Sequence, residues 1–262
     1  MWQQWTQKGN KGVDVVLLVP ETLNIQPHAV KLPMFLQELE TGLSEHKARY
    51  AVVGFGGKSG VHQHPHIVTG GGNVFGSIQD VGKAIQNMKF TNEKTDALKA
   101  IEYLQRLPFN PGATKVVILL TDQNREVNST APVTRAIKTL NMHGIIFNVI
   151  GPYFQKRKQR SVLGLWKNEA YLVKEKLQSK LHTIGLPSND YTSLAESSQG
   201  GIFNLDAYSQ SYGKLKNSLG KALKTTLIKQ IVNDQVHCRQ CVCVPSITEP
   251  MTFCRVNKHV RC

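Results

Sequence analysis

Acidic residues are scarce in this sequence, and long apolar runs are absent. The 262 residues include 18 Asp and Glu against 32 Lys and Arg, which gives a formal net charge of +14. Apolar residues make up 40% of the chain, a fraction that excludes a wholly disordered protein. No apolar run reaches the roughly 18 residues that suggest a membrane-spanning helix. Residues 1–11 are polar and lack the apolar core of a signal peptide, so we expect an N-terminal linker there.

Cysteine is missing from residues 1–237, and all five cysteines lie after them. This clustering predicts a small tail, residues 233–262, that is stabilised by disulfide bonds. The preceding domain is stable without them. Disulfides are favoured over zinc because the spacing does not give two paired ligand knuckles. The odd count leaves one cysteine free or joined to a partner outside the chain. The five are Cys238, Cys241, Cys243, Cys254 and Cys262.

Positive charge concentrates at the carboxyl end. Residues 214–262 hold nine basic residues and two acidic ones. A surface of this sign suits sulfated glycans, anionic head groups or an acidic protein, whereas no nucleic-acid-binding motif accompanies it. The spacing of Lys214, Lys221 and Lys224 places them on one helix face. We predict that these lysines, with Lys216 and Lys229, bind heparin-type polyanions.

Strand and helix patterns alternate along the chain. The apolar, β-branched run Val13–Val19 is typical of a central strand that is covered on both faces. Alternation of this kind predicts an α/β fold with a doubly wound, mostly parallel sheet flanked by helices. Further strands are expected at 50–55, 67–68, 115–120, 145–150 and 201–204, and helices near 30–39, 77–89, 94–107, 133–140, 166–181, 191–198 and 215–232.

Catalytic motifs are missing as well. The sequence has no nucleophile elbow, no phosphate-binding loop and no metalloprotease helix motif. Asp14 begins a strand, at the end of the sheet opposite to the one where ligands bind in such folds. We therefore expect a protein that is not an enzyme and needs no cofactor.

Several segments, in this order, resemble a von Willebrand factor type A domain. The resemblance covers about residues 12–232, with an insertion expected at about 152–187. It implies a Rossmann-like fold and a role in binding rather than catalysis. The segments that carry it are Val13–Val19, Arg49–Phe55, Thr95–Leu98, Lys115–Asp122, Gly144–Gly151, Leu194–Ser197 and Gly201–Leu205.

The resemblance also implies a metal-dependent adhesion site, which this sequence matches poorly. The family motif Asp-x-Ser-x-Ser reads Pro20, Thr22 and Asn24 here, so the first carboxylate is lost. Asp122 is retained, and Thr91 or Thr95 could supply the later hydroxyl. Mg²⁺ prefers hard oxygen ligands in octahedral geometry, and one carboxylate among neutral oxygens compensates little of its charge. We therefore expect no metal at the degenerate site Thr22, Asn24 and Asp122.

A dense histidine cluster follows the second strand, at His62, His64 and His66. Alternate residues of an extended segment point the same way, so the three imidazoles could converge on Zn²⁺ or Cu²⁺. Against this, Pro65 interrupts the segment, and no carboxylate or cysteine is near in the sequence. Solvent-exposed loop histidines are the favoured interpretation, and a pH-dependent contact is a further alternative.

Two other segments suggest an extracellular protein. Lys156, Arg157 and Lys158 precede Arg160 and Ser161. This run is a proprotein-convertase cleavage site, a polyanion-binding patch or a solvated charge run. Asn128 begins an N-glycosylation sequon. With the cysteine tail, these features favour a secreted glycoprotein.

These features lead to two hypotheses of function. The first is an extracellular binding domain of a larger secreted protein that contacts a protein or sulfated glycan without an adhesion metal. The second is a structural role in lipid transport, with other parts of a lipoprotein as partners. Residues 49–57, the histidine stretch and residues 73–76 resemble the end of arthropod apolipophorin-like lipid-transfer proteins, although amphipathic lipid-binding stretches are not evident.

Overall fold

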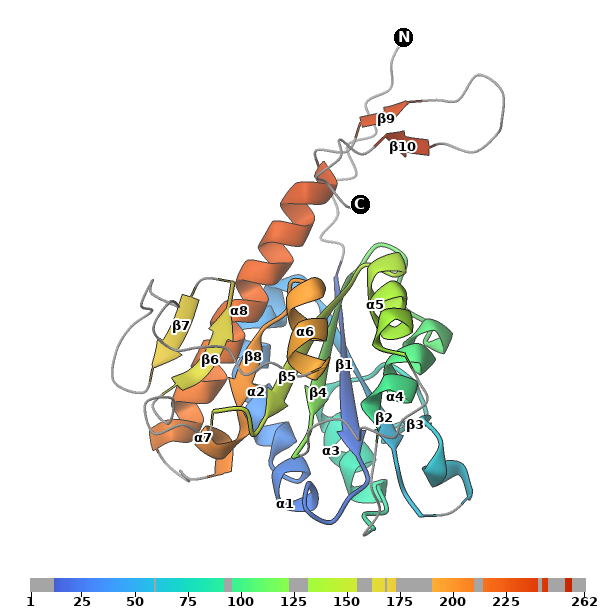
Figure 1. Cartoon of the computed structure of the whole chain (residues 1–262), viewed down its shortest axis with the longest axis vertical. Helices are drawn as coiled ribbons and strands as arrows, with labels where there is room; N and C mark the ends of the chain where they lie inside the picture. The colour runs from blue at the N-terminus through green and yellow to red at the C-terminus, as the bar shows by residue number, and fades with distance from the viewer. Residues whose placement is uncertain are drawn as a thin grey trace.

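An eight-stranded sheet with helices on both faces forms the centre of the protein (Figure 1). A computed structural model describes residues 12–58, 60–91, 96–122, 132–154, 162–167, 169–172, 190–209, 214–239, 242–244 and 253–255. The strand order is β3-β2-β1-β4-β5-β8-β6-β7. The strands are β1 (Val13–Pro20), β2 (Ala48–Phe55), β3 (His66–Val68), β4 (Thr114–Leu120), β5 (Ile145–Gly151), β6 (Val162–Trp166), β7 (Glu169–Leu172) and β8 (Ile202–Asn204).

The adjacent strands β2, β1, β4, β5 and β8 run parallel to one another. The edge strand β3 is antiparallel to β2, and β6 is antiparallel to both β8 and β7. The mostly parallel, doubly wound sheet expected from the sequence is thereby confirmed, together with an edge strand at Ile67 and Val68.

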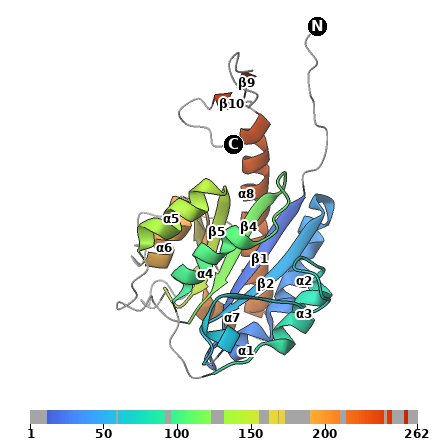
Figure 2. The ribbon, with the colours of Figure 1, turned by 90° about the vertical axis from the view of Figure 1, so that its right-hand side faces the viewer.

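Different helices cover the two faces of the sheet (Figure 2). Val15 and Leu17 of β1 pack in one core with α1 (Gln26–Ala29), α2 (Leu32–Leu43), α3 (Ile78–Asn87), α7 (Leu205–Ser209) and α8 (Lys214–Arg239). Val16 and Leu18 pack in the other with α4 (Ala97–Tyr103), α5 (Val133–Met142) and α6 (Asp190–Ser197). Because side chains alternate along a strand, a strand between two helical layers exposes neither face to water, and every residue of β1 is buried. Short 3₁₀ helices complete the chain: η1 (Ser44–His46), η2 (Gly60–Gln63) and η3 (Leu104–Arg106).

The prediction of a helix at 166–181 is wrong for the residues of this segment that the structure describes, 166–167 and 169–172. Trp166 ends β6, and residues 169–172 form β7, joined to β6 by a turn in which Lys167 has φ of 51°. Leu163 and Trp166 pack in the core that contains α8, whereas Val162 and Leu165 pack in the other core. Burial on both faces favours a strand over an amphipathic helix. Residues 162–172 of the expected insertion therefore extend the main sheet.

The last long helix, α8, continues past the expected end at Val232 to Arg239 (Figure 1). Asp234 on this helix accepts a hydrogen bond of 2.7 Å from the Thr114 hydroxyl at the start of β4. After it, β9 (Val242–Val244) and β10 (Phe253–Arg255) pair antiparallel, with Cys243 opposite Cys254 in the register. Within the described residues, no helix is long and apolar enough to cross a membrane.

Candidate functional site

The carboxyl ends of the inner strands meet at one edge of the sheet, the edge where ligands bind in open α/β folds. β1 and β2 pair in parallel with Pro20 opposite Phe55, so the loops that follow them are neighbours. The loop after β1 is fastened by its backbone: Glu21 N–H donates to the Phe55 carbonyl at 2.8 Å. The Thr91 N–H donates to the Glu21 carbonyl at 2.9 Å.

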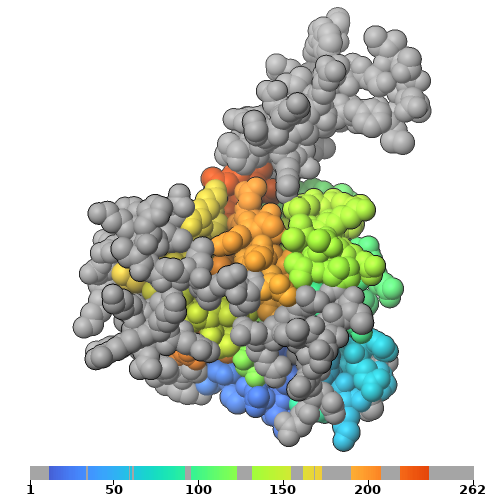
Figure 3. Space-filling model, viewed as in Figure 1, coloured from blue at the N-terminus to red at the C-terminus, as the bar shows by residue number. Residues whose placement is uncertain are grey.

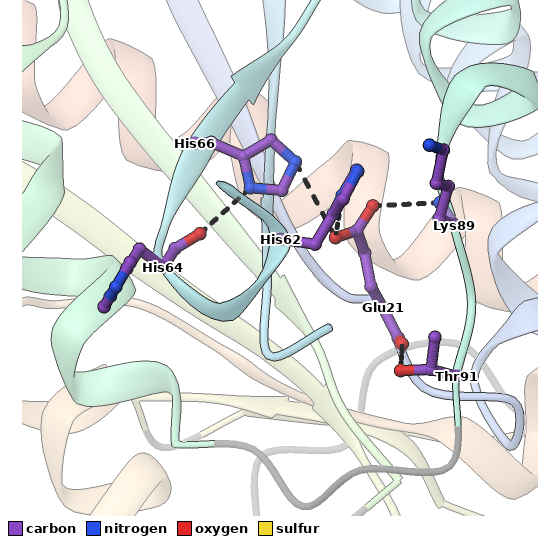
Figure 4. Close-up of polar contacts among 6 residues, drawn as sticks. All are labelled: Glu21, His62, His64, His66, Lys89 and Thr91. Carbon is purple, nitrogen blue, oxygen red and sulfur yellow. Dashed lines mark hydrogen bonds and ion pairs between the residues drawn. The ribbon is translucent and has the colours of Figure 1, made fainter. Parts of the chain in front are cut away.

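The Glu21 side chain is fully buried at this edge and turns toward two histidines (Figure 4). Its Oε2 lies 2.8 Å from Nδ1 of His62 and 3.7 Å from Nε2 of His66. Its Oε1 accepts the backbone N–H of Lys89 at 3.0 Å. A buried carboxylate is costly unless it has polar partners, and in the described part of the chain the two imidazoles are the side chains that contact it.

The histidines come from η2 and the first residue of β3. Their rings lie edge to face, with centroids 4.9 Å apart. Nδ1 of His66 lies 2.9 Å from the carbonyl oxygen of His64. A carbonyl oxygen can only accept, so this nitrogen carries the hydrogen, and in the neutral ring Nε2 presents its lone pair toward Glu21. The side chain of His64 is exposed.

Two glycines make room for the imidazoles: Gly54 lies within β2 and Gly57 follows it. A Cβ at Gly57 would lie 2.6 Å from the His62 Cβ and 3.1 Å from Glu21 Oε2. A Cβ at Gly54 would lie 3.1 Å from Cε1 and Nε2 of His66. The Gly57 N–H also donates to the His62 carbonyl at 2.6 Å, which folds the loop back over the strand end. The glycine-rich sequence is thus needed locally for close packing.

The structure corrects the expectation of solvent-exposed histidines at two of the three positions. The side chains of His62 and His66 are 21% and 18% exposed and contact a carboxylate. No carboxylate lies near the histidines in the sequence, because Glu21 belongs to the loop that follows the neighbouring strand β1. The missed signal is a Glu directly after one buried strand and histidines directly after the next. Glu21, His62 and His66 place one ligand atom each within 4.8 Å of one another and could hold a metal ion.

A sequence model of the von Willebrand factor type A domain matches residues 14–185. The chain belongs to this family. No match was found among curated proteins.

Solved structures of similar proteins include other A-type domains. Proximal thread matrix protein 1 from the mussel byssus is 15% identical, with a TM-score of 0.44, over 81% of this chain and 46% of that one. A von Willebrand factor type A protein from Catenulispora acidiphila is 16% identical, with a TM-score of 0.48, over 82% and 43%. An aerotolerance-related membrane protein from Bacteroides fragilis is 15% identical, with a TM-score of 0.49, over 83% and 100%. This chain therefore spans less than half of the mussel and Catenulispora chains.

The A-type adhesion site has a poor donor set in this domain. Pro20 ends β1 at the position of the first family carboxylate, and Asn24 is exposed. Thr22 is buried next to Thr91 through an isolated β-bridge, and its hydroxyl has no hydrogen-bond partner among the described residues. Asp122 then provides the one carboxylate at these positions. This donor set does not fit a hard cation that requires several charged oxygens.

Asp122 lies instead within electrostatic range of a half-buried histidine. Burial lowers the pKa of His28 and the charge of Lys31 lowers it further, against the opposing effect of Asp122 and Asp206. His28 lies in α1, the helix that follows the degenerate motif. The neutral form of this imidazole is therefore favoured beside Asp122.

The lysines of α8 differ in their surroundings. Lys229 Nζ lies 2.7 Å from Glu169 Oε2, and Lys224 Nζ donates to the Thr41 hydroxyl at 3.0 Å. Lys221 is exposed. For Lys214, Lys216 and the cysteines of α8, β9 and β10 only the backbone is described. The other predicted positions lie outside the described residues, namely Thr95, Asn128, Lys156, Arg157, Lys158, Arg160, Ser161, Cys241 and Cys262.

Proposed function

We propose that this A-type domain is a non-enzymatic extracellular interaction module that binds an anionic partner without an adhesion metal. The partner class is an acidic protein or a sulfated glycan. Family membership supports an interaction role, because A-type domains generally mediate protein binding. The observation that carries the metal-free part is Pro20, which ends β1 where the family places its first metal-binding carboxylate.

Charge supports an anionic partner. The chain carries 14 more positive than negative formal charges, and a net charge of this size attracts polyanions over a Debye length of about 8 Å at physiological salt. On α8, Lys221 is exposed, and the ammonium group of Lys224 donates a hydrogen bond to the neutral hydroxyl of Thr41. Among the described residues, neither of these two lysines forms an ion pair, whereas Lys229 is paired with Glu169.

The extracellular setting is proposed from the sequence of the tail and loops. Five cysteines within 25 residues suit an oxidising compartment, and the sequon at Asn128 and the basic run before Ser161 are consistent with secretion. We propose two disulfides within Cys238–Cys262, with the fifth cysteine free or joined to another chain.

A lipid-transport role remains the alternative, and it rests on the fainter resemblance of residues 49–57 and 73–76. In the fold, these residues have packing roles. The Arg49 guanidinium lies over the Phe75 ring at 4.7 Å, and Phe75 packs against Phe109 with centroids 5.6 Å apart. Val74 and Phe75 are partly buried and pack against the core on the α4 side. Packing accounts for these apolar side chains without a lipid ligand.

Heparin chromatography tests the proposed polyanion binding with a matched control. The double variant Lys221→Glu/Lys224→Glu changes the net charge by the same amount as Lys99→Glu/Lys138→Glu, whose lysines are exposed on α4 and α5. We expect the wild-type protein to elute above physiological salt and the α8 variant to elute earlier. The control variant should elute close to wild type. Wild-type elution below physiological salt, or an equal shift for both variants, would contradict the proposed binding surface.

A further inference from the structure

The buried carboxylate of Glu21 and the imidazoles of His62 and His66 meet at the carboxyl edge of the sheet (Figure 4). We propose that these three side chains form a binding site for a divalent transition metal ion, with zinc as the expected class. The ligands come from the loop after β1, from η2 and from β3. None of them belongs to the family positions Pro20, Thr22, Asn24 and Asp122.

The distances between the donor atoms suit an ion of this size. Ligands about 2.0–2.1 Å from a tetrahedral zinc ion lie about 3.3–3.4 Å from one another. Glu21 Oε2 lies 2.8 Å from Nδ1 of His62 and 3.7 Å from Nε2 of His66, on either side of that value. Shifts of less than about 1 Å at these two contacts would bring the ligands to coordination distance, and all three ligand atoms already lie within 4.8 Å.

The surroundings orient two of the ligands. His66 donates from Nδ1 to the His64 carbonyl oxygen at 2.9 Å, which leaves Nε2 as its free donor atom toward Glu21. Metal-bound histidines usually donate their other ring N–H in this way, and the contact fixes the tautomer and the ring orientation. The Lys89 N–H holds Glu21 Oε1 at 3.0 Å, so Oε2 stays directed at the imidazoles. Coordination by Nδ1 of His62 requires that this nitrogen carry no hydrogen, so the bound neutral ring would hold its hydrogen on Nε2.

Electrostatics favours a cation at this point. Nε2 of His66 and Oε2 of Glu21 face each other at 3.7 Å, so a cation between them can contact both atoms. A metal ion between them compensates the charge of a carboxylate that is fully buried. The absence of a Cβ at Gly54 and Gly57 leaves room for both rings beside that carboxylate.

An ion can reach the site from solvent. His62 and His66 are 21% and 18% exposed, and the segment of η2 and β3 lies at the surface of the molecule (Figure 3, cyan, lower right). Two imidazoles and one carboxylate suit zinc and related transition metals, whereas Mg²⁺ prefers oxygen ligands. Three protein ligands leave the fourth position of a tetrahedral ion for water or for a donor from a partner molecule.

Cobalt spectroscopy on the full chain tests the site and separates it from the cysteine tail. Protein stripped with EDTA is titrated with Co²⁺, and then with Zn²⁺ in competition. We expect one ion per chain whose visible absorption indicates four nitrogen and oxygen ligands, without a thiolate charge-transfer band. Zinc should displace it. His62→Ala and His66→Ala should each weaken zinc binding by at least about tenfold and abolish that absorption.

His64→Ala is the matched control, because it removes an exposed imidazole from the same loop and should leave binding unchanged. Asp122→Ala should also leave it unchanged. Glu21→Gln, which keeps the shape of the side chain, should weaken binding, and circular dichroism in EDTA checks that each variant is folded. No nitrogen and oxygen-ligated cobalt, or the same cobalt spectrum in folded Glu21→Gln, His62→Ala and His66→Ala proteins, would overturn the proposal. A thiolate-type spectrum alone would assign the metal to the tail and also overturn it.

Discussion

A buried carboxylate lies at each end of β1, and the two carboxylates have different partners. At the amino end, Asp14 is 1% exposed and both of its oxygens accept from Arg49, at 2.9 Å from Nε and 2.8 Å from Nη2. The Asn110 N–H donates to it as well, at 2.7 Å. At the carboxyl end, Glu21 is fully buried but is paired with two imidazoles instead of a guanidinium.

The amino end therefore holds a permanent ion pair, whereas the carboxyl end can exchange a proton for a metal ion. A guanidinium is always charged and binds a carboxylate with two parallel hydrogen bonds, and the hydrogen bond to Asp14 raises the pKa of Arg49. Imidazoles can exchange a proton for a metal ion. The amino end of β1 therefore serves stability alone, whereas the carboxyl end retains chemistry that a ligand can use.

Breaking the amino-terminal pair should give the largest effect. Arg49→Met leaves Asp14 buried without its guanidinium and removes the contact with Phe75. We expect a loss of about 3 kcal/mol in the free energy of unfolding, measured by urea denaturation. Asp14→Asn should cost less, because Arg49 is 43% exposed and water can solvate it. An equal or smaller loss for Arg49→Met than for Asp14→Asn would contradict a buried structural pair at this end.

The corresponding change at the carboxyl end should be milder when no metal is present. Glu21→Gln keeps an amide oxygen as acceptor for the Lys89 N–H and removes a buried negative charge. In EDTA we expect its free energy of unfolding to lie within about 1 kcal/mol of wild type. With zinc added, the wild-type protein alone should gain stability. A loss in EDTA as large as that of Arg49→Met would show that the two ends do not differ.

Magnesium should have no measurable effect on stability, since the family site has a poor donor set. An ion at 100 times its dissociation constant would raise the free energy of unfolding by about 2.7 kcal/mol. We expect the melting temperature to stay constant with millimolar Mg²⁺, both in wild type and in Asp122→Ala. A rise in melting temperature that Asp122→Ala abolishes would restore the metal-dependent adhesion mechanism for this domain.

Much of the fold could be predicted because burial on both faces of a parallel strand demands a continuous apolar run. Val13–Val19 and the run at 115–120 satisfy that demand, and both are inner strands. The strand at 162–166 lies in the expected insertion, where the sequence predicted only a helix from residue 166 onward. It forms a strand because it pairs between β8 and β7 and packs against α8. Similarly, the part of α8 beyond Val232 includes Asp234, which contacts Thr114, a residue 120 positions away in the sequence.

The sequence by itself determined which residues of the candidate site are present, but not that they come together in space. It shows the lost carboxylate at Pro20, the histidine cluster and the glycines beside it. It cannot show that Glu21 faces His62, because the two are 41 residues apart and come together only when β1 and β2 pair in register. Pairing in a parallel sheet brings strand ends together whatever the length of chain between them. The tertiary structure therefore decided which histidines are partly buried, which carboxylate they contact and that His64 is exposed to solvent.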